Sequence, residues 1–262
     1  MSLDYSTNVL KSKMENGKVV FGTFVKIYSP AIMEILGYAG FDFAIIDMEH
    51  GPMGYSQAED MVRAASLSSI TPIVRVASNK DYEIQKALDI GAGGVQVPQV
   101  NDRLSAEYAS NSAYYYPQGN RGVCKYVRAA KYSAISNENY FIKANQETLV
   151  VVHIEGKRGV RELPKILAVE GLDVIFLGPY DLSQSLGVTG QVDHPDVVTT
   201  MENAIDKIVK AGKIAGTFCS SVDDVLRWVT RGVHYVAFGT DTGFLYNSAK
   251  ELIIHLENLV IT

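Results

Sequence analysis

The sequence predicts a single α/β domain folded as a (β/α)8 TIM barrel, and three observations lead to that fold class. Eight short runs rich in β-branched or aromatic residues recur along the chain, and amphipathic stretches with helical periodicity separate them. The chain has 262 residues, a length at which an α/β barrel forms one domain. No change of composition marks a linker, so we assign residues 1–262 to one barrel domain. A doubly wound open sheet is the alternative fold with the same alternation.

The expected elements follow one another in regular βα order. The strand candidates cover residues 19–25, 43–47, 72–76, 94–98, 149–155, 173–178, 213–218 and 235–239. The clearest helix candidates cover residues 56–69, 82–89, 160–169, 197–211 and 222–230. The polar run at residues 193–196 contains His194 and Pro195 and is typical of a helix start, because Pro is favoured in the first turn.

Two segments predict contacts between copies of the chain. Residues 113–136 form a long tyrosine-rich stretch without clear periodicity, and loops of that length are usually functional or interfacial. Residues 247–262 are rich in Leu, Ile and Val, with more apolar surface than one barrel flank normally requires. We therefore expect a homo-oligomer whose C-terminal helix packs on a neighbouring subunit.

Composition excludes several other classes of protein. The net charge is −5 and no long basic run occurs, so nucleic acid is not an expected partner. No apolar run is long enough to cross a bilayer, and residues 1–17 lack the apolar core of a signal peptide. The two cysteines, Cys124 and Cys219, have no metal-site or disulfide-framework spacing, which favours a reducing compartment. The expected location is the cytoplasm.

Polar side chains gather at the carboxyl ends of the expected strands. In a (β/α)8 barrel these ends meet on one rim, where the active site lies. Residues far apart in the sequence are thus expected to converge there. These residues are Asp47, Glu49, His50, Arg75, His153, Glu155, Asp181 and Asp241.

Alternation along the fifth strand candidate predicts a pair of carboxylates at this rim. Residues two apart share a face, so Leu149, Val151, His153 and Glu155 point one way and an all-apolar set points the other. The second set must pack on helices, which turns His153 and Glu155 into the barrel. Glu155 and Asp181 would then face each other, and a divalent cation would compensate their charges. Oxygen ligands suit Mg²⁺ or Mn²⁺. Alone, Asp181 could instead be a helix N-cap.

Several motifs, in this order and at these spacings, resemble those of the HpcH/HpaI aldolase family. The resemblance covers about residues 21–245, and it implies a TIM barrel of the phosphoenolpyruvate/pyruvate-binding type. Proteins similar to this are class II aldolases of 2-keto-3-deoxy acids, which use a divalent metal to bind pyruvate as its enolate, and they form hexamers as trimers of dimers. The motifs are IDMEHGP, PIVRV, QKALDIGAGGVQVPQV, YYYPQGNRG, VVHIEG, FLGPYDLSQSLG and FGTDTGFL.

The resemblance implies a role for each matching position. Glu155 and Asp181 resemble the metal ligands, and His50 resembles the general acid or base, held by Asp47. Arg75 resembles the group that steadies the keto or enolate oxygen. Glu49 would hold metal-bound water, and Asp89 would sit at a subunit contact near the neighbour's site. The substrate pocket is implied at Phe24, Gly178, Pro179, Tyr180 and Phe218.

Structural readings of the same residues stay open at this point. His50 could be a turn histidine, Arg75 a structural ion pair, and Asp47 a residue that only orients the turn. Arg121 is either a surface loop charge or part of the site or interface. Residues 239–241 either cap the last helix or form an anion site on the last barrel loops.

Two positions depart from the family pattern. His153 stands where the family commonly has glutamine, and it could be a third metal ligand or a hydrogen-bonded histidine inside the barrel. Ligation by an imidazole would shift the metal preference toward Co²⁺ or Zn²⁺. Tyr180 is bulkier than the alanine of some members, which changes the shape of the pocket.

The sequence leaves three functions open for this chain. The first is an aldolase that cleaves a 4-hydroxy-2-oxo acid to pyruvate and an aldehyde. The second, on the same site, is an oxaloacetate decarboxylase or an enolate-transfer enzyme like macrophomate synthase. The third is a barrel that binds a small acid without catalysis. The convergence of acid, base and guanidinium at one rim favours an enzyme, and the sequence names neither the aldehyde nor the metal.

Overall fold

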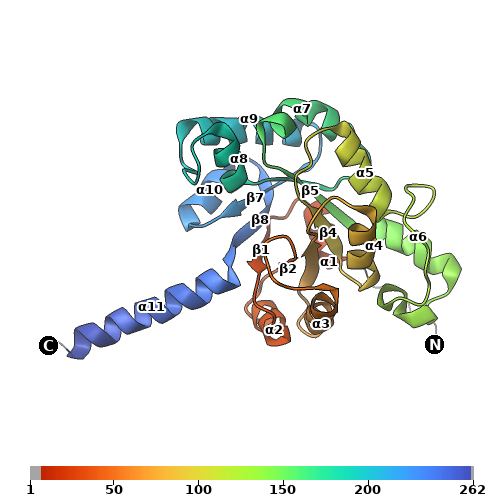
Figure 1. Cartoon of the computed structure of the whole chain (residues 1–262), viewed down its shortest axis with the longest axis horizontal. Helices are drawn as coiled ribbons and strands as arrows, with labels where there is room; N and C mark the ends of the chain where they lie inside the picture. Colours follow the sequence, from red (N-terminus) through yellow and green to blue (C-terminus); the bar gives the residue numbers. More distant parts are fainter. Residues whose placement is uncertain (1–6, 261–262) are drawn as a thin grey trace.

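A computed structural model describes residues 7–260 of the chain, apart from the side chains of residues 137–139. Eight parallel strands close into a barrel in sequence order, with helices around it (Figure 1). The first strand pairs with both the second and the eighth, at Gly22 with Phe43 and with Ala237. This closure confirms the (β/α)8 barrel and excludes the open doubly wound sheet.

All the expected strands form, with ends within two residues of their expected positions. The strands are β1 (Val20–Val25), β2 (Phe43–Asp47), β3 (Thr71–Arg75), β4 (Gly94–Val97), β5 (Leu149–Ile154), β6 (Val174–Leu177), β7 (Ile214–Cys219) and β8 (Val233–Thr240). The helices are α1 (Val9–Glu15), α2 (Pro30–Tyr38), α3 (Tyr55–Ala65), α4 (Asp81–Asp89), α5 (Arg103–Ala113), α6 (Asn137–Glu147), α7 (Lys157–Leu167), α8 (Pro179–Leu186), α9 (Pro195–Lys210), α10 (Val222–Thr230) and α11 (Asp241–Val260), with a 3₁₀ segment η1 (Arg128–Ser133).

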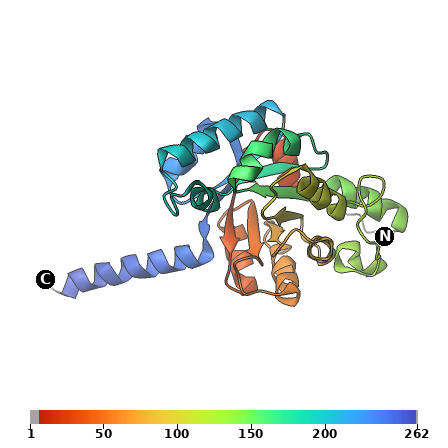
Figure 2. The same ribbon diagram turned by 45° about the horizontal axis from the view of Figure 1, so that its top comes forward.

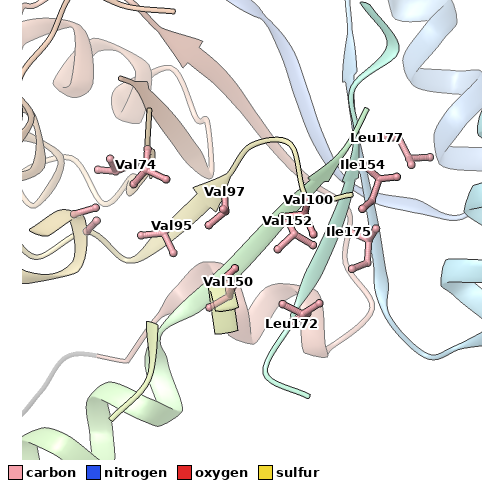
Figure 3. Close-up of a cluster of buried hydrophobic side chains, with 14 of the residues drawn as sticks. Val74, Val95, Val97, Val100, Val150, Val152, Ile154, Leu172, Ile175 and Leu177 are labelled. Atoms are coloured by element: carbon pink, nitrogen blue, oxygen red, sulfur yellow. The ribbon is translucent and has the colours of Figure 1, made fainter. Parts of the chain in front are cut away.

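Strand alternation divides the core into two parts, as expected for β5. Val150, Val152 and Ile154 pack between the strands and the helices, together with apolar residues of neighbouring strands (Figure 3). Leu149 and Val151 belong instead to the cluster that fills the barrel interior. This division fixes which side chains of each strand can reach the rim, because the side chains of a strand alternate between its two faces.

The tyrosine-rich stretch is more ordered than the sequence predicts. It ends in η1, and α6 follows it. Tyr114 and Tyr115 are buried, and Tyr115 packs edge-on against Phe141 of α6 with ring centroids 4.8 Å apart. Tyr116 and Tyr126 remain exposed, so part of this loop's apolar surface stays open in the single chain.

The C-terminal helix α11 leaves the barrel and projects away from it in both views of the chain (Figures 1 and 2). Of its described residues only Asp241, at its start, is buried. Within residues 7–260 no helix is both long and apolar enough to cross a membrane.

Candidate active site

A cavity of about 320 Å³ opens at the carboxyl ends of the strands, where the sequence predicts the site. It brings together most of the predicted site residues, from strands or loops on different sides of the barrel. Larger hollows of about 670 and 1060 Å³ lie at the opposite end, beside Pro72 and Asp173, and gather none of these residues. The predicted residues that line the cavity are Phe24, His50, Arg75, His153, Glu155, Gly178, Pro179, Tyr180, Asp181 and Phe218.

The side chain of Asp47, at the end of β2, is fully buried beneath the cavity and holds two cations. Arg75 at the end of β3 donates from Nε to Oδ1 at 2.9 Å and from Nη2 to Oδ2 at 2.7 Å. Lys26, just after β1, donates from Nζ to Oδ2 at 2.6 Å. Burial opposes ionisation of Asp47, but the arginine and the lysine outweigh it and lower the pKa of this carboxyl to about 2.

The expected pairing of the Asp47 carboxylate with the His50 imidazole is not formed. Asp47 Oδ1 instead accepts the backbone N–H groups of Glu49 and His50, each at 3.2 Å, so it does orient this turn. The His50 side chain is 60% exposed, and its Nε2 lies 3.9 Å from Glu49 Oε2. Arg75 and Lys26 already bond the two carboxylate oxygens of Asp47 in place of the imidazole.

Glu49 lies beside Arg75 with one oxygen still available. Its Oε2 is 2.8 Å from Arg75 Nη1, yet this contact lacks hydrogen-bond geometry, and the buried oxygen has no hydrogen-bond donor among the described residues. Burial raises the pKa of Glu49 and the negative charge of Glu155 adds to this, which together outweigh Arg75. An oxygen in this position can accept a hydrogen bond from a water molecule in the site.

Glu155 reaches the cavity from the end of β5, where two donors hold it. Gln99 donates its backbone N–H to Oε1 at 2.7 Å, and His153 Nδ1 bonds Oε2 at 3.1 Å. Burial raises the pKa of Glu155, but the hydrogen bonds from His153 and from the Gln99 backbone help to outweigh it, so the pKa lies below its usual value. The other ring nitrogen of His153, Nε2, is bonded by Gln96 at 2.5 Å. With both nitrogens engaged, His153 is the hydrogen-bonded barrel histidine of the two alternatives.

The carboxylates of Glu155 and Asp181 fit a hard divalent cation as part of its ligand set. Each oxygen of Glu155 takes one hydrogen bond and keeps a second lone pair. Asp181 lies in the first turn of α8, whose N-cap is Gly178, so Asp181 is not the N-cap. Residues 7–260 contain no group of three or more His, Cys, Asp or Glu placed to hold a metal ion, so water and substrate would supply the remaining ligands.

Aromatic rings form the opposite wall of the cavity. Phe24 lies 6.0 Å from Phe218, and Tyr180 lies 5.8 Å from Phe218, both measured between ring centroids. The guanidinium carbon of Arg75 is 4.7 Å from the centroid of the Phe24 ring. This cation–π contact helps the hydrogen bonds to Asp47 to hold the Arg75 side chain in place. The site thus places aromatic rings beside its charged groups.

This geometry agrees with what the chain resembles among known proteins. Residues 20–248 match the model of the HpcH/HpaI aldolase/citrate lyase family. The chain belongs to this family. A hydroxypyruvate/pyruvate aldolase of Roseobacter denitrificans is 36% identical over 94% of this chain and 95% of that protein. A 5-keto-4-deoxy-D-glucarate aldolase of Escherichia coli O157:H7 is 33% identical over 96% and 98%. A family protein from Burkholderia cenocepacia has a TM-score of 0.91 at 29% identity, over 96% of this chain and all of that one.

Membership of the HpcH/HpaI family makes the chain a carbon–carbon lyase of the aldolase type, since its relatives are named aldolases. Asp89 and Arg121 of this aldolase-type lyase lie away from the cavity and pair with each other. Arg121 donates from Nη2 to Asp89 Oδ1 at 2.6 Å, and the Arg121 side chain is 2% exposed. The surface-charge reading of Arg121 is therefore wrong, and the ion pair ties the end of α4 to the loop before η1.

In this HpcH/HpaI chain, the turn at residues 239–241 joins β8 to α11 and bonds the loop that follows β1. Asp241 Oδ1 accepts the backbone N–H of Lys26 at 3.0 Å, and Oδ2 accepts that of Ile27 at 2.9 Å. Thr240 Oγ1 accepts the backbone N–H of Gly243 at 2.9 Å, which caps the first turn of α11 and agrees with the capping alternative.

Sequence reasoning missed three polar residues of the site. Lys26 lines the cavity, while Gln96 and Tyr235 lie beneath it and bond to each other. Alternation within β4 and β8 could have turned Gln96 and Tyr235 inward, but only the pairing of the strands shows that they meet.

Proposed function

We propose that this chain is a divalent-metal-dependent aldolase that cleaves a 4-hydroxy-2-oxo acid to pyruvate and an aldehyde. The observation that carries the proposal is the cavity that Glu155, Asp181 and Arg75 share at the carboxyl ends of β3, β5 and β6. The names of the relatives support it, because they refer to pyruvate and to a keto-deoxy sugar acid.

The chemistry needs each of these groups. Cleavage leaves a carbanion next to a carbonyl, and a divalent cation at Glu155 and Asp181 would stabilise the resulting enolate charge. Arg75 is held on one side by Asp47 and on one face by Phe24, so its remaining N–H groups can donate to the 2-oxo oxygen. His50 accepts the proton of the 4-hydroxyl group, a role that an imidazole can fill near neutral pH.

The pocket walls set where the two halves of the substrate lie. The backbone of residues 178–180 and the Phe218 ring surround the pyruvyl part, and Phe24 and Tyr180 exclude water from its methyl group. Tyr180 narrows this side of the cavity because it packs on Phe218. Mg²⁺ or Mn²⁺ is the proposed metal, since the donors available from Glu155 and Asp181 are carboxylate oxygens; Co²⁺ or Zn²⁺ would be the less favoured substitutes.

A single subunit is an incomplete assembly in this proposal. We infer that the protein is a cytoplasmic homo-oligomer, a hexamer built as a trimer of dimers. The exposed apolar side chains of α11 support this, and they include Leu252, Ile253 and Leu256. Asp89 would then lie near the site of the adjacent subunit, with its ion pair to Arg121 holding the contact surface in place.

One feature favours a second candidate on the same site. The His50 imidazole is not held by Asp47. Aldol cleavage requires a positioned base, whereas a reaction that removes no hydroxyl proton does not. Decarboxylation of oxaloacetate, or transfer of its enolate as in macrophomate synthase, is such a reaction. Both candidates use the same cation, Arg75 and enolate.

The deciding experiment compares the two reactions in metal-stripped and metal-restored protein. Pyruvate with a series of aldehydes, and oxaloacetate alone, are assayed after chelation and after addition of Mg²⁺ or Mn²⁺. We expect turnover to vanish with chelator and return with metal, and Glu155→Gln to behave like the stripped protein. Glu162→Gln, on the outer helix α7, is the matched control and keeps full activity.

Each outcome of that experiment decides between the candidates. Release of pyruvate from aldol products at a higher rate than CO₂ from oxaloacetate supports the aldolase, and the reverse supports the decarboxylase. Full activity in verified metal-free protein contradicts the metal site. Binding of 2-oxo acids without any turnover in the metal-loaded protein would leave the non-catalytic acid-binding barrel.

A further inference from the structure

A chain of hydrogen bonds crosses the inside of the barrel and ends at Glu155. Tyr235 of β8 donates its hydroxyl proton to Gln96 Oε1 of β4 at 3.1 Å. Gln96 Nε2 bonds His153 Nε2 of β5 at 2.5 Å, and His153 Nδ1 bonds Glu155 Oε2 at 3.1 Å. Tyr235 and Gln96 are fully buried and His153 is 1% exposed, so water does not compete for these bonds.

The donors and acceptors of this chain run in one direction only. The Gln96 amide nitrogen can only donate, so His153 Nε2 must be the acceptor and carry no proton. The proton of the neutral imidazole is then on Nδ1, which makes His153 a donor to Glu155. The Tyr235 hydroxyl donates to the carbonyl oxygen at the other end of the amide, so every donor from Tyr235 to Glu155 has an acceptor in this arrangement. The tautomer of His153 therefore follows from the orientation of the Gln96 amide.

Packing keeps the members of the chain from turning. The His153 ring stacks on Phe176 with centroids 4.5 Å apart and an interplanar angle of 17°. The Tyr235 ring stacks on Phe43 with centroids 4.1 Å apart, below the cavity and outside its lining. Tyr235 thus has no contact with a substrate in the cavity, and it can influence the site only through Gln96 and His153.

We propose that Tyr235, Gln96 and His153 act together as positioning residues for the metal-ligand carboxylate of Glu155. The Tyr235 hydroxyl orients the Gln96 amide, the amide sets the tautomer of His153, and the Nδ1–H of His153 holds Oε2 while its second lone pair stays open to a cation. The inference rests on the proposed function in one respect, that Glu155 binds the divalent cation. Partners that orient a metal ligand in this way typically change metal affinity about 10- to 100-fold when they are removed.

Removal of one buried oxygen atom should loosen the chain. In Tyr235→Phe the buried Gln96 carbonyl loses its donor, so one of the two bonds that hold the amide is gone. The amide then holds His153 less firmly, and His153 Nδ1 holds Glu155 Oε2 less firmly in turn. Glu155 therefore spends less time in the position that suits the cation.

The test uses the full-length protein without substrate, in two measurements. Mn²⁺ binding is titrated by electron paramagnetic resonance, and ¹⁵N NMR of the imidazole nitrogens reports the tautomer of each of the five histidines. The His153 signals are assigned from their loss in His153→Gln. We expect Tyr235→Phe to weaken Mn²⁺ binding by about 10-fold or more and to shift the His153 nitrogen signals.

Matched variants separate positioning from general damage. Tyr114→Phe removes another buried tyrosine hydroxyl, which donates to the Gly171 carbonyl at 3.0 Å at the far end of the barrel, and should change neither readout. His153→Gln keeps an N–H donor for Glu155 and should retain most of the Mn²⁺ affinity, whereas His153→Leu should lose it. Rescue by Gln but not Leu is not expected if residue 153 merely fills space.

Failure of this inference differs from failure of the proposed function. Unchanged Mn²⁺ affinity in Tyr235→Phe, with normal binding in the unmodified protein, overturns the positioning role alone. Unchanged His153 nitrogen shifts in Tyr235→Phe also overturn it, whether or not metal binds. A protein that binds no Mn²⁺ at all contradicts the metal site of Glu155 and Asp181, and with it the cation that this chain is proposed to serve.

Discussion

Asp47 shows how one buried carboxylate can hold several groups around a cavity. It accepts hydrogen bonds from the side chains of Arg75 and Lys26 and from the backbone N–H groups of Glu49 and His50. With a pKa of about 2 it stays ionised at any pH where the protein would be assayed. It therefore fixes the orientation of the two cations, and through the backbone it fixes where the His50 side chain leaves the turn.

His50 is the residue whose removal should separate the two candidate reactions. We expect His50→Ala to lower aldol cleavage by about 10²- to 10⁴-fold, because a positioned acid or base contributes roughly that factor. Oxaloacetate decarboxylation, measured in the same preparation, should fall much less because no hydroxyl proton is removed. His194→Ala, which alters a helix cap outside the cavity, is the control. An unchanged cleavage rate in His50→Ala would show that His50 is only a turn histidine.

Sequence alone reaches those site residues that lie on one strand or follow a recognisable motif. Alternation along residues 149–155 was sufficient to turn His153 and Glu155 into the barrel, and the structure confirms that direction. It could not give the partner of His153, since Gln96 lies 57 positions away in sequence and meets it only across the barrel interior. The family resemblance implied that Asp47 holds His50, whereas Arg75 and Lys26 are the side chains that bond Asp47 in the structure.

At the scale of elements, strong periodicity was predicted well and irregular packing was not. The helix start at residues 193–196 is confirmed, with the His194 ring accepting the backbone N–H of Asp196 at 3.2 Å. The helix α6 was missed because it has no clear apolar stripe in sequence. Its buried residues Tyr140 and Ala144 pack instead on the tyrosine-rich loop, a satellite cluster that no barrel strand supplies.

The contact between β1 and β2 is tight enough to give a sharp prediction. A Cβ atom at Gly22 would lie 2.2 Å from the Phe43 ring, which is itself stacked on Tyr235 and cannot retreat. We expect Gly22→Ala to lower the free energy of unfolding by about 1–3 kcal/mol, as overpacked cores do, measured by urea denaturation. Gly54→Ala, where no atom lies within 4 Å of the added methyl group, should cost less. Equal stability of the two variants would mean that Phe43 can move.

At the scale of the whole molecule, α11 is the feature that a single chain does not explain. Its side chains from Leu245 to Val260 are mostly exposed, and Leu252, Ile253 and Leu256 are each about half exposed or more. A helix with this much open apolar surface normally has a partner. The barrel itself needs none of it, because the two core clusters contain no residue of α11.

Assembly can be tested by placing charges on this helix. Light scattering of the unmodified protein at micromolar concentration should give the mass of a hexamer, and the double variant Leu252→Glu and Leu256→Glu should give a smaller species. The two residues are four apart and so share one side of the helix. Glu257→Lys, which changes charge but removes no apolar contact, should leave the mass unchanged. A monomer in the unmodified protein refutes the oligomer, and intact activity and mass in Asp89→Asn refute the shared site.

The two kinds of charge in the cavity come from opposite arcs of the barrel. Lys26 follows β1 and Arg75 ends β3, whereas Glu155 and Asp181 follow β5 and β6. A nick in the exposed residues 122–124 would therefore separate the two cations that line the cavity from these two carboxylates. Two such fragments would regain the cavity only by reassociating along the β4–β5 and β8–β1 seams, so recovered metal binding would report that the barrel had closed.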